Sequence, residues 1–253
     1  RRARHPLRRV RPARARGDAV SLPFAFLDAF SGAIDFVFNE RPSLGGGTQV
    51  GGLDQVAALT LDHLELTFAG LGLALAVALP LGVWLGHRGR GELLAVALGN
   101  AGRAIPELAL IAFLVAFVGV GFINVTIALA VLGIPPILTN AFVGVRQVDR
   151  TTVEAARGMG MGELGVIARV ELPLAAPTIM AGVRTAAINI VATATIAPLA
   201  GQLSLGDFIL ARNVYGDEGV LAGAILVALL ALAFELALSG LQRAVTPRGL
   251  RAA

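Results

Sequence analysis

The 253-residue sequence contains no cysteine, and this absence excludes every function that depends on a thiol. The chain cannot form a disulfide, present a thiolate nucleophile or build a cysteine-ligated zinc site. Its three histidines, His5, His63 and His87, are scattered over chain ends and the borders of apolar runs. This distribution is typical of interface residues and does not indicate a metal cluster.

Lysine is also absent, since all 21 basic residues are arginine. A nucleotide-binding P-loop, a Schiff base and a lysine general base each need that amine, so none of them can be part of this chain. The glycine-rich stretches at 45–47 and 51–52 therefore predict a flexible loop and not a phosphate cradle. No cofactor is expected in this chain. If the protein uses energy from ATP, that energy must come from a partner.

Long apolar runs are what the sequence has in abundance. Hydrophobic residues make up 56% of the chain and the mean hydropathy is +0.76, far above the values of soluble domains. Five runs approach the length of about 20 residues that a membrane-crossing helix needs. They are Leu64–Gly86, Leu93–Val118, Phe122–Val143, Leu174–Leu199 and Val220–Leu241. The sequence therefore predicts an all-α integral membrane protein with five core transmembrane helices within residues 64–243.

Prolines interrupt three of these runs. Pro106 lies in the second, Pro135 and Pro136 in the third, and Pro198 in the fourth. Because proline lacks the amide donor and its ring displaces the preceding turn, we expect kinked or locally unwound helices at these positions.

Arginine placement predicts the orientation of the helices. If the polar segment 150–173 is cytoplasmic, nine arginines lie inside and only Arg41 and Arg212 lie outside. The inner set is Arg88, Arg90, Arg146, Arg150, Arg157, Arg169, Arg243, Arg248 and Arg251. This excess agrees with a cytoplasmic location for that segment and for the tail at 244–253.

The segment 150–173 has its own helix signals. Thr151 and Glu154 have the spacing of a capping box, so a helix is expected to begin near Thr152. Three glycines then make its continuation costly and allow a bend; they are Gly158, Gly160 and Gly162. A second short helix is expected over 163–171, before Leu172 and Pro173 open a new element. Two short helices at an angle, held outside the bilayer, suit insertion into a groove on another protein. An ordinary connector is the alternative.

This segment resembles the EAA loop of ATP-binding-cassette (ABC) importer permeases. That loop places Glu-Ala-Ala, then a glycine, an aliphatic residue and Leu-Pro at fixed spacings. The matching residues are Glu154, Ala155, Ala156, Gly160, Val170, Leu172 and Pro173. The resemblance implies that Glu154, Ala155, Ala156 and Gly160 make the contact with an ATPase. For Glu154, a helix-capping role is favoured over an intersubunit salt bridge.

The resemblance implies a type I ABC importer fold and a set of partners. Two permease subunits, identical or paralogous, would enclose the pathway, and an extracytoplasmic binding protein would deliver the substrate. Two ATP-binding subunits would dock on the bent segments 150–173, here called elbows, and would hold ATP and Mg²⁺. This chain would then be a transport subunit and not an enzyme. The implied location is a bacterial-type inner (cytoplasmic) membrane, so the lipid bilayer would be a further partner. No nucleic-acid partner is expected.

Other motifs resemble the quaternary-ammonium and betaine branch of these permeases. The run from Glu154 to Met161 and the Thr-Ala-Thr-Ile segment beginning at Thr193 carry this resemblance. It implies glycine betaine, choline or a similar osmolyte as the substrate. A methionine-type or other amino-acid ABC permease is the alternative. A secondary transporter or channel without an ATPase is a more distant one, since no inverted repeat is found.

Polar residues inside the apolar runs are candidates for the pathway or for structural roles. Arg103 and Glu107 lie four residues apart and are expected to form an ion pair, with a pathway-lining role as the alternative. Arg184 is expected to snorkel or to bind carbonyls of the elbow, and Glu235 has no obvious partner. The further candidates are Pro106, Asn140, Thr193 and Thr195.

A candidate extracytoplasmic gate follows the fourth apolar run. Its residues are Gly201, Leu205, Gly206 and Asp207. The family often has Gly-Ala-Gly-Gly-Leu-Gly here, whereas this chain keeps only the outer glycine and the Leu-Gly positions of that pattern. Close backbone packing of the gate is therefore less expected in this chain than in its relatives.

The N-terminal region gives two conflicting signals. Residues 22–38 place an apolar stripe and a polar stripe at helical spacing, which favours a helix lying on the membrane. The arginine-rich arm at 1–21 favours the cytoplasm instead, which would require this helix to cross. We expect the arm to be disordered, the helix at 22–40 to be interfacial in preference to crossing, and 41–63 to be an extracytoplasmic linker.

Overall fold

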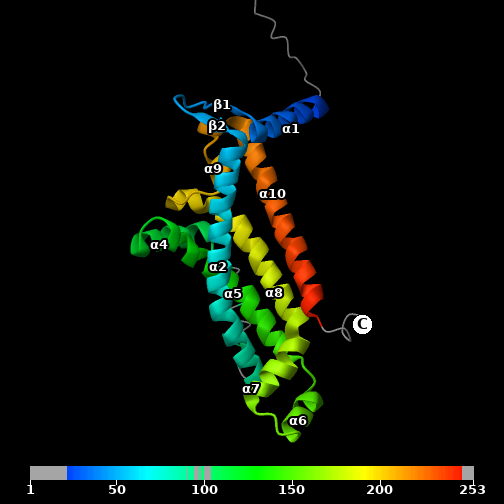
Figure 1. The fold of residues 1–253 in the computed structure, drawn as a ribbon. Coiled ribbons are helices and arrows are strands. Elements are labelled where there is room, and N and C mark those ends of the chain that lie inside the picture. Colours follow the sequence, from blue (N-terminus) through cyan, green and yellow to red (C-terminus); the bar gives the residue numbers. More distant parts are fainter. Residues whose placement is uncertain (1–21, 90, 94–96, 98, 100–103, 247–253) are drawn as a thin grey trace, which may run out of the picture.

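The computed structural model describes residues 22–89, 91–93, 97, 99 and 104–246 (Figure 1). In this part of the chain, four helices are long and apolar enough to cross a membrane. They are α2 (Gly52–Arg88), α5 (Phe122–Arg146), the continuous helical run Glu163–Ala200, and α10 (Arg212–Val245). The predicted all-α membrane fold is confirmed, and four of the five expected spans are present as long helices.

Of the second expected span, the residues that the structure describes include one short helix. α4 (Glu107–Val118) has 12 residues, so it is about 18 Å long and shorter than the apolar core of a bilayer, which is about 30 Å thick. It begins directly after Pro106, whose extended backbone forms the N-cap. Arg103 lies outside the described residues, so the expected Arg103–Glu107 ion pair stays a prediction.

The fourth span is continuous with the polar segment before it. α7 (Glu163–Val166) runs into the π-helical turn η1 (Ile167–Glu171), then α8 (Leu172–Thr193) and the 3₁₀ segment η2 (Ala194–Ala200). As expected, a new element, α8, begins at Leu172, although it follows η1 without a gap in the helical run. Pro173 lies in the first turn of α8, where its missing amide disturbs the helix least.

The two proline sites of α5 and η2 differ in their effect. At Pro198 the helix has the tighter 3₁₀ form, which agrees with the local distortion expected at this proline. At Pro135 and Pro136 the expected unwinding does not occur, because α5 continues as one α-helix from Phe122 to Arg146. α5 is packed between α2 and α8, and neighbouring helices of this kind let a membrane helix retain proline.

The bundle is held together by small residues that let helix backbones approach closely. A Cβ atom on Gly82 of α2 would lie 2.7 Å from the Leu138 carbonyl oxygen of α5, and one on Gly86 would lie 2.8 Å from the Phe142 carbonyl oxygen. On the other side of α5, a Cβ atom on Gly182 of α8 would lie 2.6 Å from the Pro136 carbonyl oxygen. In a bilayer such close packing replaces the hydrophobic effect as the force between helices.

The end of the bundle opposite the polar segment is covered by the N-terminal elements. α1 (Leu22–Phe38) lies across this end and not alongside the spans (Figure 1). It is followed by a hairpin of β1 (Glu40–Pro42) and β2 (Gln49–Gly51). The expected linker 41–63 is therefore structured, since it comprises most of this hairpin and the first turns of α2.

α1 is held by an aromatic cluster. Phe36 is fully buried and meets Phe208 of α9 (Gly206–Leu210) edge to face, with 5.1 Å between the ring centres. Tyr215 of α10 packs edge-on against both rings. The predicted apolar stripe is on another face, because Leu27, Phe30, Ile34 and Phe38 are exposed. Phe36 and Ala33 anchor the helix to the protein, together with the partly buried Val37 of that stripe.

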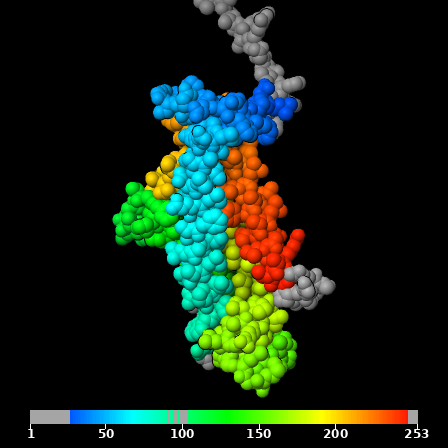
Figure 2. All heavy atoms as spheres, viewed as in Figure 1, coloured from blue at the N-terminus to red at the C-terminus, as the bar shows by residue number. Residues whose placement is uncertain are grey.

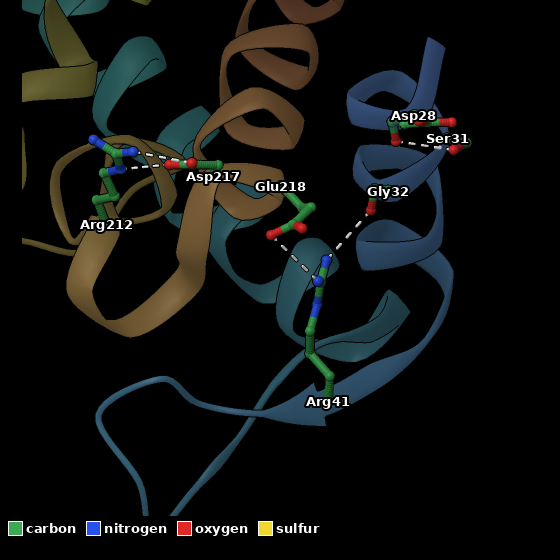
Figure 3. Close-up of polar contacts among 7 residues, drawn as sticks. All are labelled: Asp28, Ser31, Gly32, Arg41, Arg212, Asp217 and Glu218. Atoms are coloured by element: carbon green, nitrogen blue, oxygen red, sulfur yellow. Dashed lines mark hydrogen bonds and ion pairs between the residues drawn. The ribbon is translucent and has the colours of Figure 1, made fainter. Parts of the chain in front are cut away.

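Arg41 joins three elements at the same end (Figure 3). Its guanidinium donates to the Gly32 carbonyl oxygen of α1 at 3.3 Å and lies 3.5 Å from the Glu218 carboxylate of α10. The same group lies 4.7 Å from the centre of the Phe36 ring. Nearby, Arg212 pairs with Asp217 inside the first turns of α10 (Figure 3). The hairpin is thereby fixed to both helices.

We expect Gly82→Leu to destabilise the protein by about 1–3 kcal/mol, because the added side chain overlaps the backbone of α5. Gly72→Leu is the matched control, since Gly72 is on the same helix but nothing lies within 4 Å of its Cβ position. Thermal unfolding of both variants in detergent measures the difference. Equal melting temperatures would contradict the role of Gly82 in helix packing.

Candidate functional site

The polar segment forms an elbow beyond the ends of the spans, at the opposite end from α1 (Figure 1). Its first arm is α6 (Arg150–Gly158), which is capped by Asp149 and not by Thr151. The Asp149 carboxylate accepts from the Thr151 amide at 3.1 Å and from the Thr151 hydroxyl. The hydroxyl and amide of Thr151 thereby hold the pKa of Asp149 below its ordinary value. The expected capping box is wrong because Asp149 occupies the cap position two residues earlier.

The corrected cap changes the interpretation of Glu154. Its carboxylate is not needed at the start of the helix, and the side chain is exposed on α6 together with Ala155. Ala156, by contrast, is buried with Val153 and Val166 in a small apolar cluster that holds the two arms of the elbow together. Of the adjacent residues Glu154, Ala155 and Ala156, two are accessible to a partner and the third has an internal packing role.

Gly160 makes the bend between α6 and α7. Its φ angle of 86° lies in the left-handed region, which glycine adopts without steric cost. Gly158 ends α6 and Gly162 precedes α7, and neither has a positive φ angle. The three glycines are therefore not equivalent, and the conformation requires glycine only at position 160.

Two apolar side chains project from the elbow. Met159 is 75% exposed and Leu164 is 82% exposed, although both belong to an otherwise polar region. Both side chains are therefore accessible to a partner. Their only signal in the sequence is an apolar residue on each side of the Gly160 bend.

His87 connects the elbow to the end of α2. Its Nδ1 atom lies 2.7 Å from the carboxylate of Glu171, and its Nε2 atom lies 2.7 Å from that of Glu163. Arg157 of α6 binds the same Glu163 carboxylate at 2.9 Å. The imidazole is buried, as is Glu171. A chain of polar contacts thus joins α2, both arms of the elbow and η1. No local pattern in the sequence predicts these contacts, because His87 is distant in sequence from the other three residues.

Arg184 and Glu235 form a second polar link, between α8 and α10. The Arg184 guanidinium lies 3.1 Å from the Glu235 carboxylate and donates to the Gln242 side-chain oxygen at 3.1 Å. Gln242 in turn donates to the Pro177 carbonyl oxygen at 3.0 Å. The expectation that Arg184 binds the elbow is therefore wrong, and Glu235 has a partner that its sequence position did not suggest.

The candidate pathway residues do not gather at one place. Glu107 lines a cavity of about 220 Å³ with two polar side chains of α8, Thr185 and Asn189, which the sequence analysis did not single out. The remaining lining is apolar: Ile105, Leu132, Pro135 and Pro136. Asn140 instead donates to the Pro136 carbonyl oxygen at 2.8 Å. Its side chain packs against α8 at Gly182, where the glycine leaves room for it.

The candidate gate is closely packed in spite of its altered glycine pattern. A Cβ atom on Gly206 would lie 1.8 Å from the Thr195 carbonyl oxygen, so only glycine fits there. Ser204 reinforces the contact, since its hydroxyl donates to the Ala194 carbonyl oxygen at 2.9 Å. The altered pattern made close packing less expected here, but Gly206, which the sequence retains, is the position at which the backbones meet.

The other gate residues support this contact. Asp207 accepts from the Ser204 amide at 2.9 Å, and partial burial raises the pKa of its carboxyl group. Leu205 is buried, and Gly201 ends η2 with a left-handed φ of 72°. Thr193 is buried at the end of α8, and the Thr195 hydroxyl donates to the Ala192 carbonyl oxygen at 2.6 Å.

Known proteins share both the sequence and the fold. A carnitine transport permease protein of Listeria monocytogenes is 39% identical over 195 residues, which cover 77% of this chain and 89% of the relative. A choline transport system permease protein of Bacillus subtilis is 36% identical over 193 residues, covering 76% and 89%.

Among solved structures, inward-facing MetNI methionine ABC transporter superposes with a TM-score of 0.66 at 22% identity, covering 77% of this chain and 98% of that one. An amino acid ABC transporter gives 0.56 at 19% identity, with 74% and 92% covered. Residues 78–250 match the family described as binding-protein-dependent transport system inner membrane component. The match spans more than half of the chain, so the protein belongs to this family of ABC transporter permeases.

Proposed function

We propose that this chain is the permease subunit of a bacterial importer for a quaternary-ammonium osmolyte such as choline, carnitine or glycine betaine. The names of its relatives support this substrate class. In the proposed assembly, two permease subunits, identical or paralogous, enclose the pathway in the inner membrane. Two ATPase subunits bind ATP and Mg²⁺, and a binding protein delivers the substrate from outside.

The elbow is the observation that carries the proposal. Its exposed groups, Glu154, Ala155, Met159 and Leu164, offer one carboxylate and a small apolar surface beyond the spans. A carboxylate can pair with a basic group of an ATPase, while the apolar groups fill a groove. Since the cap of α6 is Asp149, Glu154 is available for this intersubunit contact.

Two connections would carry motion of the elbow into the membrane. The first is covalent, because the helical run Glu163–Ala200 extends without a break for 38 residues, or about 57 Å, up to the gate. The second is the His87 bridge to α2, which holds Glu163 and Glu171 at once. Closure of the ATPase dimer would draw the paired elbows together, and α2 and α8 would then move as one unit.

Recognition of the substrate is assigned mainly to the binding protein. A quaternary ammonium group is best held by several aromatic faces. The only Trp of the sequence, Trp84, lies beside the elbow, whereas the only Tyr, Tyr215, packs against Phe36 of α1 at the other end of the bundle. Within the permease, the cavity lined by Glu107 offers a carboxylate to a passing cation. Attraction of this kind aids passage without the tight binding that would delay release.

We expect ATP-dependent uptake of radiolabelled choline, carnitine or glycine betaine by proteoliposomes that contain the permease, its cognate ATPase and a loaded binding protein. Methionine, tested at the same concentration with the same complex, should not be taken up. Uptake of methionine without any uptake of the quaternary-ammonium compounds would assign the protein to the amino-acid class instead.

We expect Gly160→Ala to reduce substrate-stimulated ATP hydrolysis on the order of tenfold, because an alanine in the left-handed region costs roughly 1–2 kcal/mol and shifts the bend. Gly162→Ala is the matched control: it is equally open to solvent but has an ordinary φ angle. ATP hydrolysis with and without loaded binding protein is the measurement. Equal activity of the two variants would show that the bend does not govern coupling.

We expect Glu171→Gln to uncouple the complex without releasing the ATPase, because it weakens the His87 bridge and leaves the exposed face of α6 unchanged. The transport-to-hydrolysis ratio should fall, while the ATPase should still co-purify. Arg169→Gln is the control, since Arg169 is exposed on the same turn. A His87→Ala/Glu171→Gln double variant should lose no more than His87→Ala alone. Additive losses would contradict the bridge.

A further inference from the structure

A basic cavity of about 550 Å³ lies where α2 meets the elbow. Its lining is Trp84, His87, Arg88, Arg150, Arg157, Glu163, Leu164 and Ile167. Three guanidinium groups thus face one carboxylate, and that carboxylate is already bound by His87 and Arg157. The excess of positive charge favours an anionic ligand.

The guanidinium groups come from two separate segments. Arg88, near the end of α2, lies over the Trp84 ring at 5.1 Å from its centre. Arg150, in the first turn of α6, reaches back so that its guanidinium lies 3.0 Å from the Cβ position of Gly89. Within the part of the chain that the structure describes, neither Arg88 nor Arg150 forms an ion pair. Their planar donors suit the oxygens of a phosphate group.

The surface of α2 above the cavity is suited to acyl chains. Leu73, Val77, Leu81 and Trp84 follow one another at helical spacing, and each is between 39% and 51% exposed. Figure 2 shows α2 on the outer face of the molecule over most of its length. The apolar stripe ends at Trp84, a residue type that gathers at the boundary between lipid and water. The basic cavity begins at the same residue, which places it at headgroup level.

We propose that this cavity binds the phosphate headgroup of an anionic phospholipid of the cytoplasmic leaflet, with one acyl chain along the Leu73–Trp84 stripe. A phospholipid headgroup and free phosphate would both present a phosphate oxyanion to Arg88 and Arg150. The adjoining apolar stripe favours the lipid. A headgroup at this place touches both α2 and the elbow. It would thereby strengthen the same junction that His87 bridges.

The single tryptophan makes the site directly observable. Trp84 is the only Trp of the chain and lines the cavity, so its fluorescence reports on this place alone. The full chain is placed in phosphatidylcholine nanodiscs. Increasing fractions of a lipid brominated near the headgroup are included, and this lipid is phosphatidylglycerol in one series and phosphatidylcholine in the other. We expect brominated phosphatidylglycerol to quench the fluorescence at a lower lipid fraction than brominated phosphatidylcholine does.

Variants test the assigned arginines. Arg88→Gln and Arg150→Gln should each reduce the preference for phosphatidylglycerol about fivefold, whereas Arg243→Gln, an exposed arginine of α10 outside the cavity, should leave it unchanged. The preference is the ratio of quenching by brominated phosphatidylglycerol to quenching by brominated phosphatidylcholine, measured in the same variant. A changed quantum yield of Trp84 therefore does not affect it. Equal loss in the Arg243 variant would mean that general surface charge and not the cavity attracts the lipid, and would overturn the proposal.

Two further results would also overturn it. Equal quenching by the two brominated lipids in the unaltered protein would show that the cavity does not select an anionic headgroup. Abolition of the preference by inorganic phosphate, at an ionic strength matched with chloride, would assign the cavity to free phosphate. Persistence of the preference under added phosphate supports the lipid.

Discussion

Close approach of helix backbones in an apolar solvent is the constraint on which this structure depends. Within a bilayer, apolar side chains gain nothing by leaving lipid for protein, so the helices must gain stability from packing. α5 meets that requirement on two sides, through Gly82 and Gly86 of α2 and through Gly182 of α8. The same closeness recurs outside the bundle, where Gly206 meets the backbone of Thr195.

Polar contacts are concentrated where the glycine contacts end. At one end, Arg41 joins α1, the hairpin and α10; at the other, His87 joins α2 to the elbow. Of these groups His87 and Glu171 are buried, and burying them would be costly if they were not paired with each other. The polar contacts therefore link the elements at each end of the bundle to one another.

The elbow combines two kinds of surface that its sequence pattern does not separate. Val153, Ala156 and Val166 hold its arms together, whereas Glu154 and Ala155 face outward. The matching residues of the family pattern thus serve internal packing as well as any external contact. The basic cavity beside the elbow adds a membrane-facing side to the same junction, so lipid and ATPase would act on one structural unit from different directions.

The sequence by itself determined the membrane class, the positions of four spans and the elbow with its bend at Gly160, because these follow from apolar length and from the few residues that favour a turn. Its family resemblance identified the permease family, which the comparisons confirm. Only the tertiary structure decided which partner each polar side chain has: Asp149 displaced Thr151 as the cap, and Glu235 and His87 found partners in other segments. Local spacing encodes turns and helix faces, whereas contacts between distant segments depend on how whole helices pack.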